Sequence, residues 1–123
     1  MNIGSKVKFL LEAQIQFKIM HWQTKGYARH NAFGMIYDTL SDLIDTFVEE
    51  AMGKYGRFVL EEGDKTIQLQ NLSEINGKAM INTIAQSLVQ FTDEFDPTDT
   101  NLLNVRDEML GSVYKLSYLL TLE

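Results

Sequence analysis

The chain has 123 residues and a net charge of −6, and apolar residues make up 45% of it. This length supports one hydrophobic core, so we expect a single domain over residues 1–123. The absence of cysteine excludes disulfides, thiolate zinc sites and cysteine nucleophiles. The basic residues are scattered through an acidic chain, which argues against nucleic acid as a partner, because phosphate binding needs clustered Lys and Arg.

Membrane insertion and secretion are not expected either. No apolar run approaches the ~20 residues that cross a bilayer. The first apolar run is soon broken by Glu12, Gln14 and Gln16, so it does not read as a signal peptide. We therefore expect a soluble protein with no membrane partner, either cytoplasmic or virion-associated.

Helical periodicity predicts two helices in the first half of the chain. Residues 5–24 form the first, with Ser5 as its cap and Gly26 at its end. Residues 28–52 form the second, which Gly53 and Gly56 end. Its core stripe consists of Phe33, Ile36, Leu40, Leu43, Phe47 and Ala51.

Residues 54–72 break the helical period. Two apolar stretches flank Glu61, Glu62, Gly63 and Asp64, which predicts a short hairpin or an extended arm; a short extra helix is the alternative. An arm of this length can carry the chain from one end of a bundle to the other.

Two further helices are predicted after this arm. One opens at Ser73 and Glu74 and runs to about Phe91. The next starts with Asp96 as cap and Pro97 in the first helical position, and its stripe reaches Leu120. The expected fold is therefore an all-α four-helix bundle with one long crossover, the connection typical of ferritin-like topology.

Four residues of the first two helices are candidate metal ligands: His21, His30, Asp45 and Glu49. On a continuous helix the last three share one broad face, but the fifteen residues from His30 to Asp45 span ~22 Å. Metal–ligand bonds are no longer than roughly 2.5 Å. One chain therefore cannot place all four residues on one ion.

Two interpretations follow from this spacing. In the first, a two-fold axis lays a second copy antiparallel, so that Asp45 and Glu49 of one subunit meet His21 and His30 of the other. In the second, the two acids are solvated and the histidines are polar groups at helix ends. Spacing alone leaves both open.

The segment His21-Trp22-Gln23-Thr24-Lys25-Gly26, followed by His30, Asp45 and Glu49, resembles the signature of the Dps-type mini-ferritins. The resemblance is close over about residues 7–52, and small phage-encoded proteins also look like this segment. It implies an intersubunit iron site that oxidises Fe(II), with iron storage or protection from oxidative stress as its purpose. His and carboxylate ligands suit Fe(II), although Zn or Mn would also fit. Glu49 would bridge two irons, and Trp22 would support the site by intercepting radicals.

The chain also departs from that family. The connection between the two histidines is shorter, Gly34 stands where the family often has an acid, and a lysine-bearing tail is missing, so DNA binding is not expected. Ferroxidase activity is thus one hypothesis. The alternatives are a non-catalytic ferritin-like structural or assembly protein, for example phage-encoded, with a degenerate metal site, and a protein-binding adaptor that uses the 54–72 arm.

Overall fold

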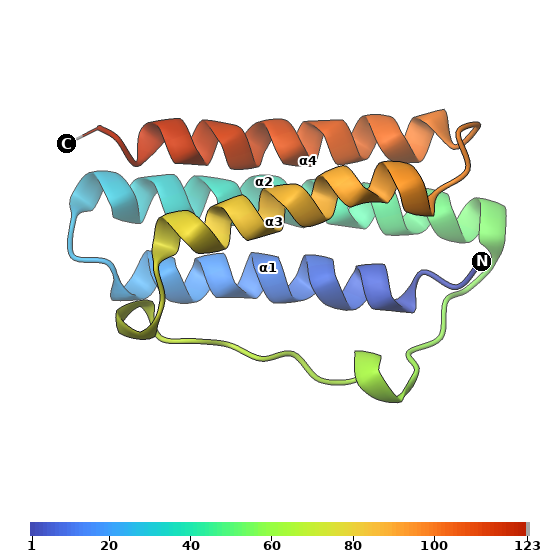
Figure 1. The fold of residues 1–123 in the computed structure, drawn as a ribbon, viewed down its shortest axis with the longest axis horizontal. Helices are drawn as coiled ribbons and strands as arrows, with labels where there is room; N and C mark the ends of the chain where they lie inside the picture. Colours follow the sequence, from blue (N-terminus) through green and yellow to red (C-terminus); the bar gives the residue numbers. More distant parts are fainter. Residues whose placement is uncertain (123) are drawn as a thin grey trace.

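A computed structural model describes residues 1–122 of the chain. Four long helices run along a common direction (Figure 1): α1 (Gly4–Gln23), α2 (Tyr27–Tyr55), α3 (Gly77–Glu94) and α4 (Thr100–Leu119). Two single 3-10 turns, η1 (Glu62–Asp64) and η2 (Leu72–Glu74), interrupt the connection between α2 and α3. No strand occurs within residues 1–122. The predicted all-α four-helix architecture with one long crossover is confirmed.

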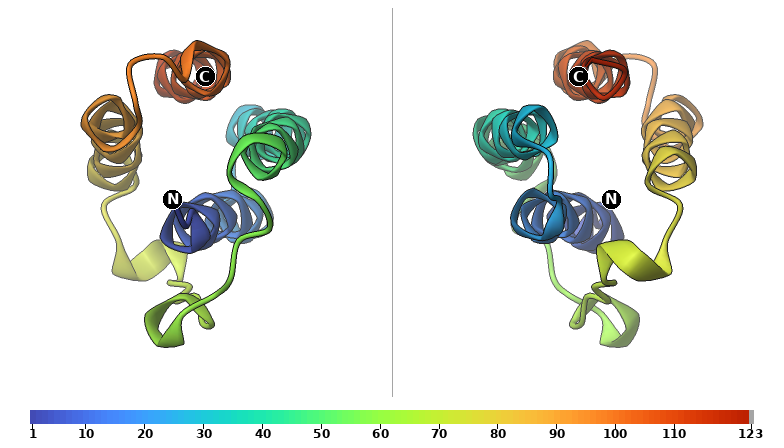
Figure 2. Two further views of the ribbon diagram at one scale, coloured as in Figure 1. Left: turned by 90° about the vertical axis from the view of Figure 1, so that its right-hand side faces the viewer. Right: turned by 90° about the vertical axis from the view of Figure 1, so that its left-hand side faces the viewer.

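The helices form a ring when viewed end on (Figure 2), in the order α1, α2, α4, α3. α1 packs on α2, α2 packs on α4, and α4 packs on α3. The fourth side of the ring, between α1 and α3, is more open. The core that fills the ring comes from all four helices and includes Phe17, Met20, Phe47, Ile81, Leu88, Leu102, Met109 and Leu116.

The observed helix boundaries differ from the predicted ones at several capping residues. α1 matches its predicted span to within one residue, but the predicted cap is wrong: Ser5 lies inside the helix, and the N-cap residue is Ile3, which forms no side-chain cap bond. α2 continues through Gly53 and ends only at Gly56, whose φ of 83° suits glycine. The predicted start of α3 at Ser73 is wrong. Asn71 and Glu74 cap each other's backbone and close η2 as a separate turn, and Asn76 then caps α3 by accepting from the Ala79 amide at 3.1 Å.

The predicted start of α4 is also wrong. Asp96 does not cap a helix at Pro97; its carboxylate accepts from the amide and the hydroxyl of Thr98 at 2.8 and 2.7 Å. This closes a local turn, and the helix begins three residues later, at Thr100. A side chain that satisfies a tight turn competes with helix capping for the same carboxylate oxygens.

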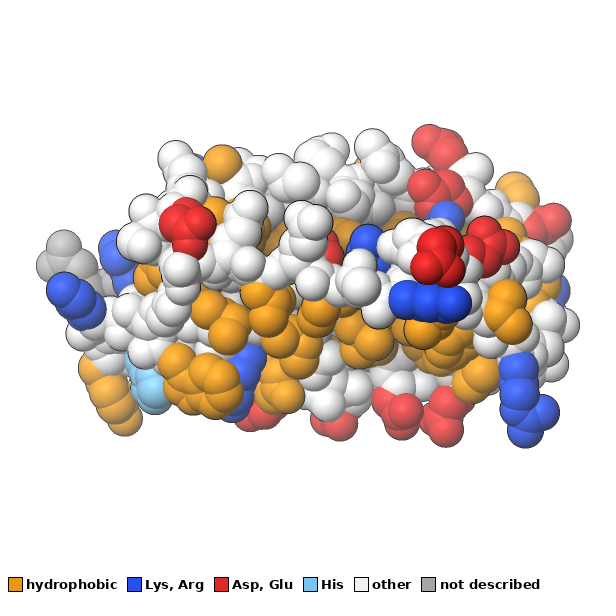
Figure 3. All heavy atoms as spheres, turned by 90° about the horizontal axis from the view of Figure 1, so that it is seen from below, with side chains coloured by type: hydrophobic (Ala, Val, Ile, Leu, Met, Phe, Trp, Pro, Cys, Tyr) orange, Lys and Arg blue, Asp and Glu red, His pale blue; other side chains and the backbone are white. Residues whose placement is uncertain are grey.

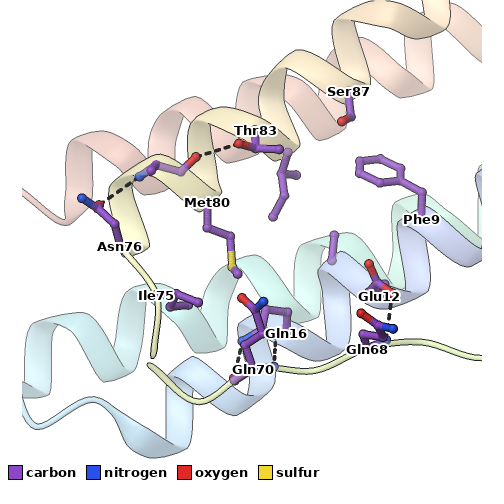
Figure 4. Close-up of a pocket in the computed structure, with 13 residues that line it drawn as sticks. Phe9, Glu12, Gln16, Gln68, Gln70, Ile75, Asn76, Met80, Thr83 and Ser87 are labelled. Atoms are coloured by element: carbon purple, nitrogen blue, oxygen red, sulfur yellow. Dashed lines mark hydrogen bonds between the residues drawn. The ribbon is translucent and has the colours of Figure 1, made fainter. Parts of the chain in front are cut away.

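The crossover is an extended arm and not a hairpin or a helix, and one face of α1 holds it in place. The polar residues Lys8, Glu12, Gln16 and Gln23 recur at spacings of four, four and seven, which puts them on one side of the helix. Each bonds to the crossover: Lys8 to the Gly63 carbonyl, Glu12 to the Gln68 amide, Gln16 to both backbone groups of Gln70, and Gln23 to Asn71 and Leu72. Figure 4 shows the central part of this attachment.

Candidate functional site

The two histidines lie together where α1 ends and α2 begins. His21 is in the last turn of α1, and His30 is in the first turns of α2. Their imidazole rings stack, with centroids 3.8 Å apart and planes inclined by 22°. Both side chains are half-buried. The shorter connection between them therefore does not keep them apart, because it brings the rings into direct contact.

Each imidazole bonds to the backbone of the other histidine. Nδ1 of His21 lies 2.6 Å from the carbonyl oxygen of His30, and Nδ1 of His30 lies 2.8 Å from the carbonyl oxygen of His21. A carbonyl oxygen only accepts, so each Nδ1 carries the proton. In a neutral imidazole the Nε2 atom then holds a free lone pair. Both rings are fixed in the tautomer that would present Nε2 to a metal ion or a hydrogen-bond donor.

Gly34 makes room for this pair. A Cβ atom on Gly34 would lie 3.0 Å from Cε1 and 3.1 Å from Nδ1 of His21. Such contacts are tighter than ordinary van der Waals packing, so a larger side chain here would have to displace the ring. The sequence presented Gly34 as a missing ligand. The structure gives it a packing role.

Asp45 and Glu49 do not reach the histidines of their own chain. α2 is continuous from Tyr27 to Tyr55, so the spacing of ~22 Å between His30 and Asp45 holds. Both acids are exposed on the outer face of α2. Within residues 1–122, no group of three or more His, Asp or Glu side chains is placed to hold one metal ion. The intersubunit arrangement stays a prediction, because a single chain does not test it.

Trp22 lies in the last turn of α1, and 64% of it is exposed. Its ring lies 5.3 Å from the ammonium of Lys18, and the same ammonium lies 4.6 Å from the ring of Tyr37. Lys18 thus sits between two aromatic rings by cation–π contacts. This cluster joins α1 to α2 next to the histidine pair. The i, i+4 spacing of Lys18 and Trp22 was the signal available in the sequence.

A band of exposed apolar side chains runs over α1 and the crossover (Figure 3). Such side chains on these two segments are Leu11, Trp22, Val59, Leu60, Ile67 and Leu69. Along the arm, the backbone amides of Gln68 and Gln70 donate to side chains of α1, and both residues line the groove beside it. Ile67 and Leu69, which alternate with them, are exposed. The crossover therefore adds apolar surface instead of covering it. We refer to these six residues as the apolar band.

The open side of the ring holds a groove of about 550 Å³ between α1, α3 and the crossover (Figure 4). Ala13, Ala79 and Ile84 line it together with Phe9 and Met80, and amide side chains of the crossover edge it. Glu12 is the only charged residue in its lining. One oxygen of this carboxylate accepts a hydrogen bond from the Gln68 backbone amide at 2.9 Å, so Glu12 helps to attach the crossover to α1.

A second polar cluster lies at the opposite end of the bundle, and the sequence analysis missed it. Asp99 is completely buried and accepts hydrogen bonds from the ammonium of Lys54 and the hydroxyl of Tyr55. The hydrogen bond from Lys54 has the larger effect, and together with the one from Tyr55 it holds the pKa of Asp99 below its usual value of 3.8. The same carboxylate raises the pKa of Lys54 and that of Tyr55. The cluster ties the end of α2 to the turn before α4.

The chain is similar to one family of proteins and to one phage protein. Residues 21–120 match a family model described as "Family of unknown function (DUF5856)". The chain is 32% identical over 114 residues to a protein of Enterobacteria phage T4 named "Uncharacterized 14.6 kDa protein in mobD-ri intergenic region". That alignment covers 93% of this chain and 84% of the phage protein. No solved structure matches the chain significantly.

These matches overturn the resemblance to the Dps-type mini-ferritins. The family that matches residues 21–120 is a different one, and neither match is described as ferritin-like. The short motif around His21 and Trp22 was misleading, because its spacing depends on a single turn between two helices. Unrelated helical hairpins contain the same kind of turn. The resemblance to small phage-encoded proteins is the part that the T4 relative supports.

Proposed function

The chain belongs to the DUF5856 family of unknown function, and from that premise we propose that it is a non-catalytic, phage-encoded structural or assembly protein that associates with copies of itself. Its site of action would be the cytoplasm of the infected cell or the virion. None of the helices in residues 1–122 has both the length and the apolar character of a membrane span. The long crossover between α2 and α3 supports a ferritin-like connectivity as the finer description of the fold.

The apolar band is the observation that carries this proposal. Its six large apolar side chains are exposed on adjoining segments, although the bundle has a well-filled core of its own. Contiguous apolar surface on a soluble domain typically marks a protein interface. Trp22 and the branched side chains of the arm would supply the anchors of such an interface.

Sedimentation velocity over a range of concentrations tests the proposal. The native chain should form a species heavier than its 14.1 kDa monomer. The variant Trp22→Ser, Ile67→Ser, Leu69→Ser should shift this equilibrium toward the monomer by at least about tenfold in the dissociation constant. Val89→Ser is the matched control, since Val89 is an exposed apolar residue on α3, away from the apolar band. A native chain that stays monomeric at all concentrations would contradict self-association.

The tautomers of the histidine pair favour a second candidate, a metal site shared by two copies. Each ring donates Nδ1–H to a backbone carbonyl, and such a hydrogen bond usually orients a metal-ligating histidine. His21 and His30 of one copy would bind one Fe(II), Zn or Mn ion together with Asp45 and Glu49 of another. Both acids are exposed and available for such a contact. Fe(II) at this site would be the substrate of any oxidation reaction.

Metal titration by calorimetry, paired with sedimentation, tests this candidate. Metal should bind and should stabilise a dimer, and both effects should be lost in His21→Gln and in Asp45→Asn. Glu108→Gln, an exposed acid on α4, is the control. Metal binding that survives Asp45→Asn unchanged would contradict the shared site. Aerobic Fe(II) oxidation no faster than in these variants would exclude ferroxidase activity.

A further inference from the structure

A cavity of about 420 Å³ opens at the end of the bundle where α1 meets α2. All four helices and the crossover contribute to it. The core residues Met20, Phe33 and Ile81, each at most 3% exposed, line its interior together with Leu72 and Leu120. Its size lies within the range of about 300–1,000 Å³ typical of small-molecule sites, and like them it is mainly apolar.

Two cations line the same cavity, Arg29 from α2 and Lys78 from α3. No Asp or Glu lines it. Neither cation takes part in an ion pair within the described part of the chain. Although the chain has a net charge of −6, every charged residue that lines this cavity is a cation, and these cations set the sign of the charge that would be attracted.

The positions of the two cations also favour an anion. Arg29 is in the first turn of α2 and Lys78 is in the first turn of α3, and neither turn contains an acid. A cation near a helix N-terminus is repelled by the helix dipole. An anion placed between Arg29 and Lys78 would remove this repulsion at both helix starts while pairing with the side chains themselves.

We propose that this cavity binds an amphipathic anion as a single dissolved molecule, not as part of a micelle or a membrane. The apolar body would occupy the space lined by Met20, Phe33 and Ile81, and a carboxylate or phosphate head would pair with Arg29 and Lys78. Thr24 and Ser117, which also line the cavity, would supply hydroxyl donors to the head. The site uses neither the apolar band nor the histidine pair, so it does not depend on the proposed function.

Calorimetric titration of the full chain with decanoate, below the concentration at which it forms micelles, tests the proposal. Saturable binding is expected, and it should be at least about tenfold weaker in Arg29→Gln, Lys78→Gln, because both charge-assisted contacts are lost. Lys65→Gln is the matched control, since Lys65 lies on the crossover away from the cavity. Ser117→Phe, which places a ring in the cavity, should abolish binding. Unchanged melting temperatures would show that all variants are folded.

Three ligand comparisons separate the alternatives. Decanol has the body without the charge and acetate has the charge without the body, and each should bind at least about tenfold more weakly than decanoate. Vesicles of anionic phospholipid should not compete with decanoate. Equal binding of decanol and decanoate, undiminished binding in the double variant, or binding to vesicles alone would each overturn the proposal. The sedimentation result for self-association is unaffected by any of these outcomes.

Discussion

Gly34 and His21 face each other so closely that a single methyl group on Gly34 would come within 3.0 Å of the imidazole. The helix that contains Gly34 would ordinarily gain from alanine at this position, because glycine costs a helix interior roughly 0.5–1 kcal/mol. The close approach to His21 therefore outweighs the preference of the helix for alanine at this position. It also couples the backbone of α2 to the position of a ring on α1.

Gly34→Ala should show this conflict directly. We expect it to lower the free energy of unfolding, or at best to leave it unchanged, because the methyl group must push the His21 ring from its stack with His30. Gly53→Ala is the control in the same helix, since a Cβ on Gly53 meets no atom within 4 Å. The control should gain roughly 0.5–1 kcal/mol. Urea denaturation measures both, and an equal gain in the two variants would refute the packing role of Gly34.

Asp99 makes the stability of the bundle depend on pH. Its pKa in the fold is lower than its ordinary value of 3.8, so its contribution is complete above that value and is lost as the pH falls through the folded-state pKa. The pKa of Lys54 is raised above 10.5, so the contribution of Lys54 is complete below 10.5 and is lost at still higher pH. A plateau of stability should therefore extend between these two limits.

Asp99→Asn should lower the melting temperature on this plateau by on the order of 5 °C or more, because the ammonium of Lys54 loses its charged partner. The difference from the native chain should shrink as the pH falls below about 4. Asp93→Asn, an exposed acid on α3, serves as the control. Thermal unfolding followed by circular dichroism from pH 2 to 9 measures the effect. A difference that stays constant across this range would contradict the assignment.

The sequence predicted the helices well because their apolar stripes are long and regular, as in Phe33, Ile36 and Leu40 of α2. It failed where side chains close local turns, since Asp96 and Glu74 looked like helix caps and instead bond within a turn and a 3-10 turn. Of the candidate site, it singled out the two histidines, whose metal-binding role stays a prediction. It could not show their reciprocal bonds, nor the contact of Gly34 with His21, nor the burial of Asp99, because each depends on how two helices are placed.

Gln16 should be the strongest single attachment of the crossover. Its side chain is 4% exposed and forms two hydrogen bonds of 2.9 Å, one to the amide and one to the carbonyl of Gln70. Gln16→Ala should cost about 1–3 kcal/mol, because two backbone groups lose their partner. Gln90→Ala, at an exposed position of α3, should be near neutral. Hydrogen exchange at the Gln70 amide should accelerate in the first variant only, and unchanged exchange there would contradict this role.

The crossover also approaches the start of α1 at Gly4, where a Cβ would lie 2.3 Å from the carbonyl oxygen of Val59. That distance is far below any real contact, and the neighbour is backbone, so the arm must move away in Gly4→Ala. We expect faster proteolysis within residues 56–66 and a lower melting temperature, with the four helices retained. Gly111→Ala, which has open space around its Cβ, should show neither change. Limited trypsin digestion at Arg57 and Lys65 measures the effect, and identical cleavage rates in the native chain and Gly4→Ala would show that the arm does not depend on this contact.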